Sequence, residues 1–163
     1  MEDLLETKIT ALKDMFNEKT FNFFILNAIT FNIYLVFWLV ERYKIFNQMA
    51  GRTIVSRTML IVLLVLITLP SEILASYILD YGVGGGLYFL LYILAMAWLV
   101  PYYMIVFSIS KTMQFFYLDK FGVDLKFNTF YLILFGLFYI NYMINDLEMV
   151  EQKEIIKKMR NNN

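Results

Sequence analysis

Cysteine and histidine are both absent from this sequence of 163 residues. Without cysteine, the chain can form no disulfide, thiolate metal site or cysteine nucleophile. Without histidine, it lacks the commonest general base and the commonest protein ligand for transition metals. Serine–histidine hydrolases and H-E-x-x-H metalloproteases are therefore excluded. We predict that the protein is not an enzyme and that it has no catalytic residue, cofactor site or metal site.

An excess of charge of either sign is also missing. The chain has 14 lysines and arginines and 14 aspartates and glutamates, so its formal net charge is zero. Proteins that bind nucleic acid usually carry a basic excess. We therefore expect no nucleic-acid partner.

Residues 58–110 contain neither lysine nor arginine, and their only charges are Glu72 and Asp80. The whole chain is 60% hydrophobic, compared with about 45–50% for soluble proteins. Two long apolar segments, 58–80 and 87–110, are joined by a glycine-rich turn. Each is long enough to cross a hydrocarbon core of about 30 Å. The pattern predicts a membrane hairpin, with the lipid bilayer as its main partner.

Two further hydrophobic segments, 21–40 and 127–145, are weaker because polar residues interrupt them. They either cross the bilayer or enter it and return to the same side. Four crossings would divide the 14 basic residues evenly between the two sides, whereas two crossings would place all 14 on one side, as the positive-inside rule prefers. Because four-helix bundles are common, we expect four crossings and keep two crossings as the alternative.

The expected fold is an all-α integral membrane protein in one domain, residues 1–163, with four hydrophobic helices. One apolar stripe on an otherwise polar sequence predicts an amphipathic helix over residues 1–20. The charged segment 146–163 predicts a cytoplasmic helical tail. With either number of crossings the two termini lie on the same side, which we expect to be the cytoplasmic face of a bacterial inner membrane.

Glu72 is the first candidate functional residue, because a carboxylate inside the hydrocarbon is costly and often belongs to an ion or proton path. It lies roughly 22 Å along a helix from Arg57. Pro70 would free a backbone carbonyl beside it, and Asp80 would lie at the exit. A second helix break is expected at Pro101. Alternatively, the helix ends near Pro70, and Glu72 is an exposed carboxylate at the start of the next helix.

Asn27, Thr30 and Asn32 interrupt the first hydrophobic segment. Such side chains hydrogen-bond across helices or line a wet cavity, and bonding between helices is the more common role. With Glu72 and Asp80, they make up the candidate polar path of the protein.

Residues 26–47 read LNAITFNIYLVFWLVERYKIFN. This segment resembles the opening segment of a bacterial family of small polytopic membrane proteins of unknown function, which carries I-T-x-x-I-Y-x-x-x-W-L, then a basic stretch and an asparagine. Asn32 stands where that family usually has glycine. The resemblance implies a small α-helical membrane protein and no particular activity. The matching residues are Ile29, Thr30, Ile33, Tyr34, Trp38, Leu39 and Asn47.

These patterns favour a non-enzymatic membrane component that assembles into a homo-oligomer and forms a pore or channel. The alternative is a membrane anchor or sensor subunit that docks a soluble cytoplasmic protein, for example in a bacterial defence system. A third hypothesis is a membrane protein that binds a lipid or small molecule within its helices.

Overall fold

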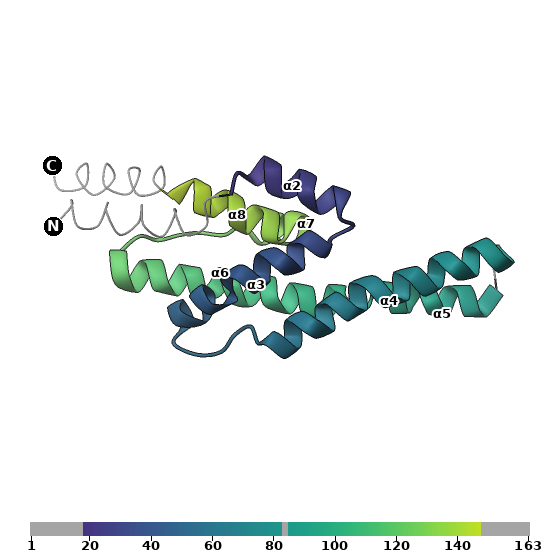
Figure 1. The fold of residues 1–163 in the computed structure, drawn as a ribbon. Coiled ribbons are helices and arrows are strands. Elements are labelled where there is room, and N and C mark those ends of the chain that lie inside the picture. The colour runs from purple at the N-terminus through teal and green to yellow at the C-terminus, as the bar shows by residue number, and fades with distance from the viewer. Residues whose placement is uncertain (1–17, 83–84, 148–163) are drawn as a thin grey trace, which may run out of the picture.

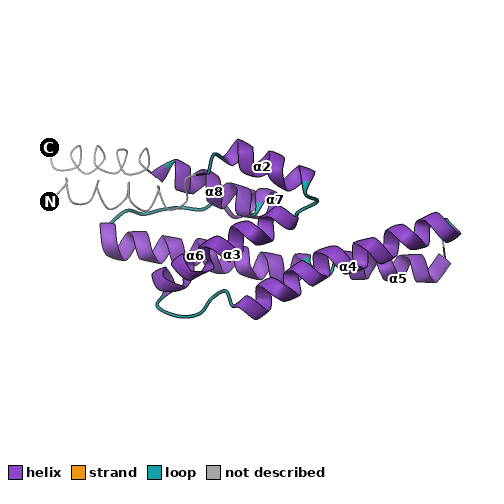
Figure 2. Ribbon diagram, viewed as in Figure 1, coloured by secondary structure: helices purple, strands orange, loops and turns teal. Residues whose placement is uncertain are grey.

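The computed structural model describes residues 18–82 and 85–147, which form helices and connecting loops without a β-strand (Figure 2). The predicted amphipathic helix over residues 1–20 and the predicted tail lie almost entirely outside these ranges. The helices of the described part are α2 (Thr20–Ile29), α3 (Ile33–Ala50), α4 (Arg57–Tyr81), α5 (Gly85–Met96), α6 (Leu99–Phe121), α7 (Thr129–Phe135) and α8 (Leu137–Asn145).

The described chain has two regions of different thickness (Figure 1). We call residues 18–67 and 98–147 the helical body, and residues 68–82 and 85–97 the outer hairpin. The body contains α2, α3, α7 and α8 packed around α6 and the first part of α4. The outer hairpin is the far part of α4 with α5 beside it. The main cluster of buried hydrophobic residues includes no described residue between Ile67 and Tyr102.

Two helical stretches are long and apolar enough to cross a membrane: α4, with 25 residues, and the nearly continuous pair α5–α6, with 37 residues. At about 1.5 Å per residue, they are roughly 37 Å and 55 Å long. They contain the two segments, 58–80 and 87–110, that the sequence predicts as the strongest spans. The other two hydrophobic segments do not form comparable helices in the described chain.

Residues 21–40, expected as one helix, instead form α2, a turn and the start of α3. Phe31 and Asn32 take φ angles of 49° and 69°, which an α-helix cannot contain. The rings of Phe23 and Trp38 lie 5.1 Å apart, although a straight helix would separate them by about 22 Å. The segment therefore folds back on itself after the turn.

Residues 127–145 are divided in the same way, into α7 and α8. Gly136 lies between the two helices with φ 52° and ψ −123°, a conformation that is accessible essentially only to glycine. The rings of Phe127 and Tyr139 lie 5.9 Å apart, and the N–H of Asn128 donates to the Tyr139 hydroxyl at 3.3 Å. Of the four hydrophobic helices expected, only the two strong segments form long helices, and each weaker segment forms two shorter helices joined by a turn.

The two prolines have different local effects. Helix α4 continues through Pro70, so the expected break at that residue does not occur. Pro101 lies in the first turn of α6, where a missing N–H costs no hydrogen bond. The ring of a proline clashes with the carbonyl four residues earlier, which here belongs to Ala97. The interruption between α5 and α6 includes Ala97, so Pro101 explains its position.

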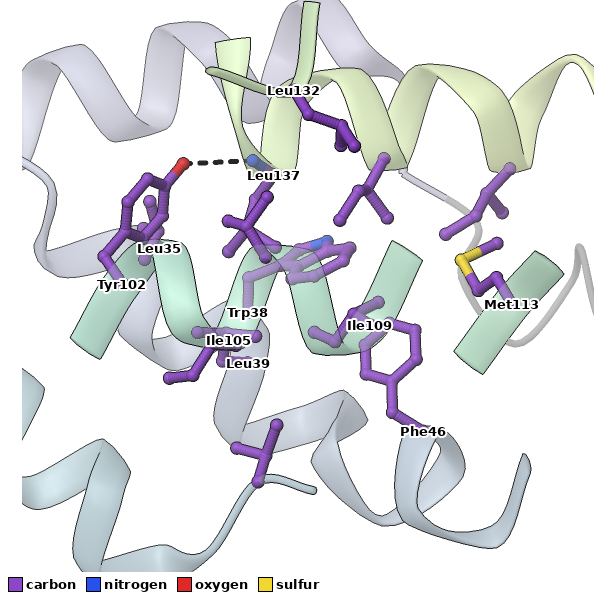
Figure 3. Packing of buried hydrophobic residues seen from close by; sticks show 14 of the residues in the cluster. Leu35, Trp38, Leu39, Phe46, Tyr102, Ile105, Ile109, Met113, Leu132 and Leu137 are labelled. Carbon is purple, nitrogen blue, oxygen red and sulfur yellow. Dashed lines mark hydrogen bonds between the residues drawn. The ribbon is translucent and has the colours of Figure 1, made fainter. Parts of the chain in front are cut away.

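The core of the body forms where α3 and α6 pack together, with Leu39 beside Ile105 (Figure 3). The N–H of Leu137 donates to the Tyr102 hydroxyl at 3.0 Å, which joins α6 to the start of α8. A side-chain carbon at Gly136 would overlap this same hydroxyl. The glycine therefore allows both the sharp turn and the close approach of α6.

Candidate functional site

Asn27, Thr30 and Asn32 all lie at the turn between α2 and α3. Asn27 Nδ2 donates to Asn32 Oδ1 at 3.0 Å, and Asn27 Oδ1 accepts the N–H of Leu35 at 3.1 Å. Thr30 Oγ1 accepts the N–H of Tyr34 at 3.0 Å and donates to a carbonyl of α2 at 2.8 Å. A helix break leaves backbone groups without helical partners. These three side chains supply the missing partners.

A second polar cluster joins the chain before α2 to α3 and α8. We call it the Glu18 cluster; its members are Glu18, Tyr34, Arg42, Asn141 and Asn145. The Tyr34 hydroxyl donates to Glu18 Oε1 at 2.7 Å, and Arg42 Nη2 lies 3.7 Å from Glu18 Oε2. Burial and the Glu18 carboxylate raise the pKa of Tyr34 to about 12. The phenol therefore keeps its proton at neutral pH and remains a donor to Glu18.

Arg42 is buried although it is charged. Its guanidinium lies 4.9 Å from the centre of the Trp38 ring, within the range of a cation–π interaction. Arg42 Nη1 also lies 2.8 Å from Glu41 Oε2. Two carboxylates and an aromatic face thus offset the cost of removing this cation from water.

Asn141 and Asn145 lie one turn apart on α8 and bind the same two groups. The Nδ2 atoms of both donate to the carbonyl of Glu18, at 3.1 Å and 3.0 Å, and to Thr20 Oγ1, at 3.2 Å and 3.1 Å. Asn141 Oδ1 has no hydrogen-bond partner within the described part of the chain. The pair fixes the end of α8 against the start of α2, so the first and last described residues lie close together.

Asn47 holds the loop between α3 and α4. Its Oδ1 accepts the N–H groups of Ile54 and Val55, at 2.8 Å and 3.0 Å, and its Nδ2 donates to the Val55 carbonyl at 2.8 Å. Ser56 then caps α4 by accepting the N–H of Met59 at 3.1 Å. These bonds set the direction in which the long helix leaves the body.

Glu72 and Asp80 lie apart from both polar clusters, on the part of α4 that belongs to the outer hairpin. Both are exposed, and eight residues of helix separate them by about 12 Å. The structure thus divides the candidate polar path: three of its residues lie in the α2–α3 turn and two on the outer hairpin. No group of histidine, cysteine, aspartate or glutamate in the described ranges is arranged to hold a metal ion.

Sequence reasoning did not single out Glu18, Arg42 or Tyr102. A signal for Arg42 was present, since it follows Trp38 by four residues and therefore lies above it on one helix face. Glu18 and Tyr102 offer no such signal, because their partners are distant in the sequence. Comparison of this chain with protein-family models, curated proteins and solved structures gave no match.

Proposed function

We propose that this chain is a non-enzymatic integral membrane protein that crosses the bilayer twice and presents its loops and termini at one face as an anchor or sensor for a soluble partner. The observation that carries the proposal is the separation of charge along the fold. Every described lysine and arginine belongs to the helical body, and the outer hairpin has none. Under the positive-inside rule, the body is the cytoplasmic end.

The folded-back segments support two crossings. Helix α2 and the turn after it expose Phe24, Ile29 and Phe31, and α7 exposes Phe130 and Ile133. Large apolar side chains exposed together in this way are stable only against lipid or another apolar surface. Because each segment reverses direction at its turn, it enters the cytoplasmic leaflet and returns. Backbone groups at the turn form hydrogen bonds within the protein, as groups inside a membrane must.

Trypsin tests this topology directly, because it cleaves only after lysine and arginine. Added to the cytoplasmic side of oriented membrane vesicles, it should cut at Arg52 and Lys120. Added to the opposite side, it should leave the chain intact, since residues 58–110 offer no cleavage site. A Val83→Lys variant, cut only from that opposite side, controls for access. Cleavage of the unmodified chain from both sides would indicate four crossings and overturn the proposal.

A homo-oligomeric pore is the second candidate, and the exposure of Glu72 favours it. A carboxylate that faces lipid is costly, and a second copy packed on this face of α4 would enclose it. Cross-linking in the membrane should then give oligomers, and Glu72→Gln should change ion flux through liposomes. A monomeric band, or flux unchanged by the substitution, would count against the pore.

A further inference from the structure

We propose that the groove between α3 and α4 binds one anionic phospholipid from the leaflet that surrounds the helical body; this inference rests on the proposed membrane location. The groove has a volume of about 370 Å³. Val36 and Leu60 are buried at its floor, and Val40 and Ile61 are exposed along its sides. Its walls are thus largely aliphatic, as an acyl chain requires.

The two ends of the groove differ in polarity. Lys44 and Arg57 line one end, beside the loop that joins the two helices, while Val36 and Leu64 lie at the other. Eight residues of α3 separate Lys44 from Val36, which is about 12 Å. Cations at the membrane surface followed by about 12 Å of apolar wall match a phospholipid headgroup and the upper part of its chain.

The basic end of the groove carries two positive charges, from Lys44 and Arg57. Neither Lys44 nor Arg57 has a carboxylate within ion-pairing distance in the described part of the chain. Arg57 Nε donates to the Tyr43 hydroxyl at 3.0 Å, which holds the guanidinium at the groove and leaves its two Nη groups for a phosphate. Basic pockets between membrane helices commonly take anionic headgroups in this way.

Native mass spectrometry can test the site on the full-length protein, released from nanodiscs of equal phosphatidylglycerol and phosphatidylcholine. We expect one retained phosphatidylglycerol per protomer in the unmodified protein. The double variant Lys44→Gln/Arg57→Gln should lose about 30-fold in preference for phosphatidylglycerol, the contribution of two cations near an anionic headgroup. A matched control, Arg52→Gln/Lys111→Gln, removes two exposed cations outside the groove and should retain the lipid.

A second pair of variants tests the apolar wall without changing charge. Val40→Trp fills the groove and should release the lipid, whereas Phe37→Trp, at an exposed position of α3 outside the groove, should not. Equal loss in groove and control variants, or no loss in any variant, would overturn the site.

Proteinase K treatment of the same nanodisc samples separates this proposal from the one on which it rests. This protease cleaves after apolar and aromatic residues, which are frequent throughout residues 58–110, so only lipid can protect that region. Protected fragments that cover segments 58–80 and 87–110, with no lipid preference, overturn only the groove. Digestion of both segments overturns the membrane location and the groove together.

Discussion

The helical body and the outer hairpin are both built from apolar helices, but different interactions hold them together. In the body, buried polar side chains join the helices across long stretches of sequence, as Asn141 joins α8 to Glu18. In the outer hairpin, the Thr68 hydroxyl donates within its own helix, to the Leu64 carbonyl at 2.9 Å. There, long helices pack as a simple pair and expose most of their apolar surface.

The difference shows that hydrophobicity alone does not decide whether a segment forms one continuous helix. All four segments are apolar, but two of them contain a residue that can leave the helical conformation together with partners for the freed backbone groups. Asn27 provides such partners at the α2–α3 turn, and Tyr102 does so at the α7–α8 turn. In the outer hairpin, by contrast, α4 continues as a helix even through Pro70.

The largest difference in stability between the two regions is expected when a methyl group is added at one glycine in each of them. Gly136→Ala should lower the free energy of unfolding by about 4 kcal/mol, because the new carbon overlaps the Tyr102 hydroxyl and the backbone is strained. Gly82→Ala, at the end of α4, also has a positive φ but meets open space, and should cost about 1 kcal/mol. Unfolding of the two variants in mixed micelles measures both changes in free energy. Equal losses of stability would contradict the close packing at Gly136.

Removing one leucine side chain from each region is the next test. Leu39 is 0% exposed in the body, and Leu79 is 86% exposed on the outer hairpin. Leu39→Ala should cost about 3 kcal/mol because it leaves a cavity, whereas Leu79→Ala should cost less than about 0.5 kcal/mol. The same unfolding measurement compares them. A larger loss at Leu79 would mean that its face packs against another protein surface.

The polar turn should be less sensitive than the core but still distinct from an exposed site. Asn27→Leu removes two hydrogen bonds and leaves the N–H of Leu35 unpaired, so we expect a loss of about 2 kcal/mol. Asn22→Leu changes an exposed position on the same helix and should lie within about 0.5 kcal/mol of the unmodified protein. If both variants were neutral, Asn27 would not be needed for the turn.

The sequence predicts the all-helical fold of the described residues and the two long apolar helices, because an uncharged run such as 87–110 leaves few other structures in lipid. For the two weaker segments it leaves crossing and folding back as alternatives. Asn32 and Gly136 are visible as irregular residues, but a single asparagine or glycine is also tolerated within a helix. What decides the break is a partner distant in the sequence, such as Tyr102 for the backbone beside Gly136.

For the candidate site, the sequence indicates which polar residues are unusual but not how they are arranged in space. Asn27, Thr30 and Asn32 stand out as polar residues in an apolar segment, but their joint role in one turn depends on backbone angles that composition does not reveal. Arg42 reads in the sequence as an ordinary flanking charge, and its burial depends on Glu18 and on the Trp38 ring.

Cysteine labelling with a membrane-impermeant reagent tests whether the chain crosses the bilayer twice and whether both broken segments return to their own side. The chain has no native cysteine, so single cysteines at positions 52, 84, 119 and 163 report without background. We expect Arg52→Cys, Asp119→Cys and Asn163→Cys to react from the same side, and Gly84→Cys to react from the opposite side. Reaction of positions 52 and 119 opposite to position 163, with position 84 on the side of position 163, would show four crossings and contradict the account.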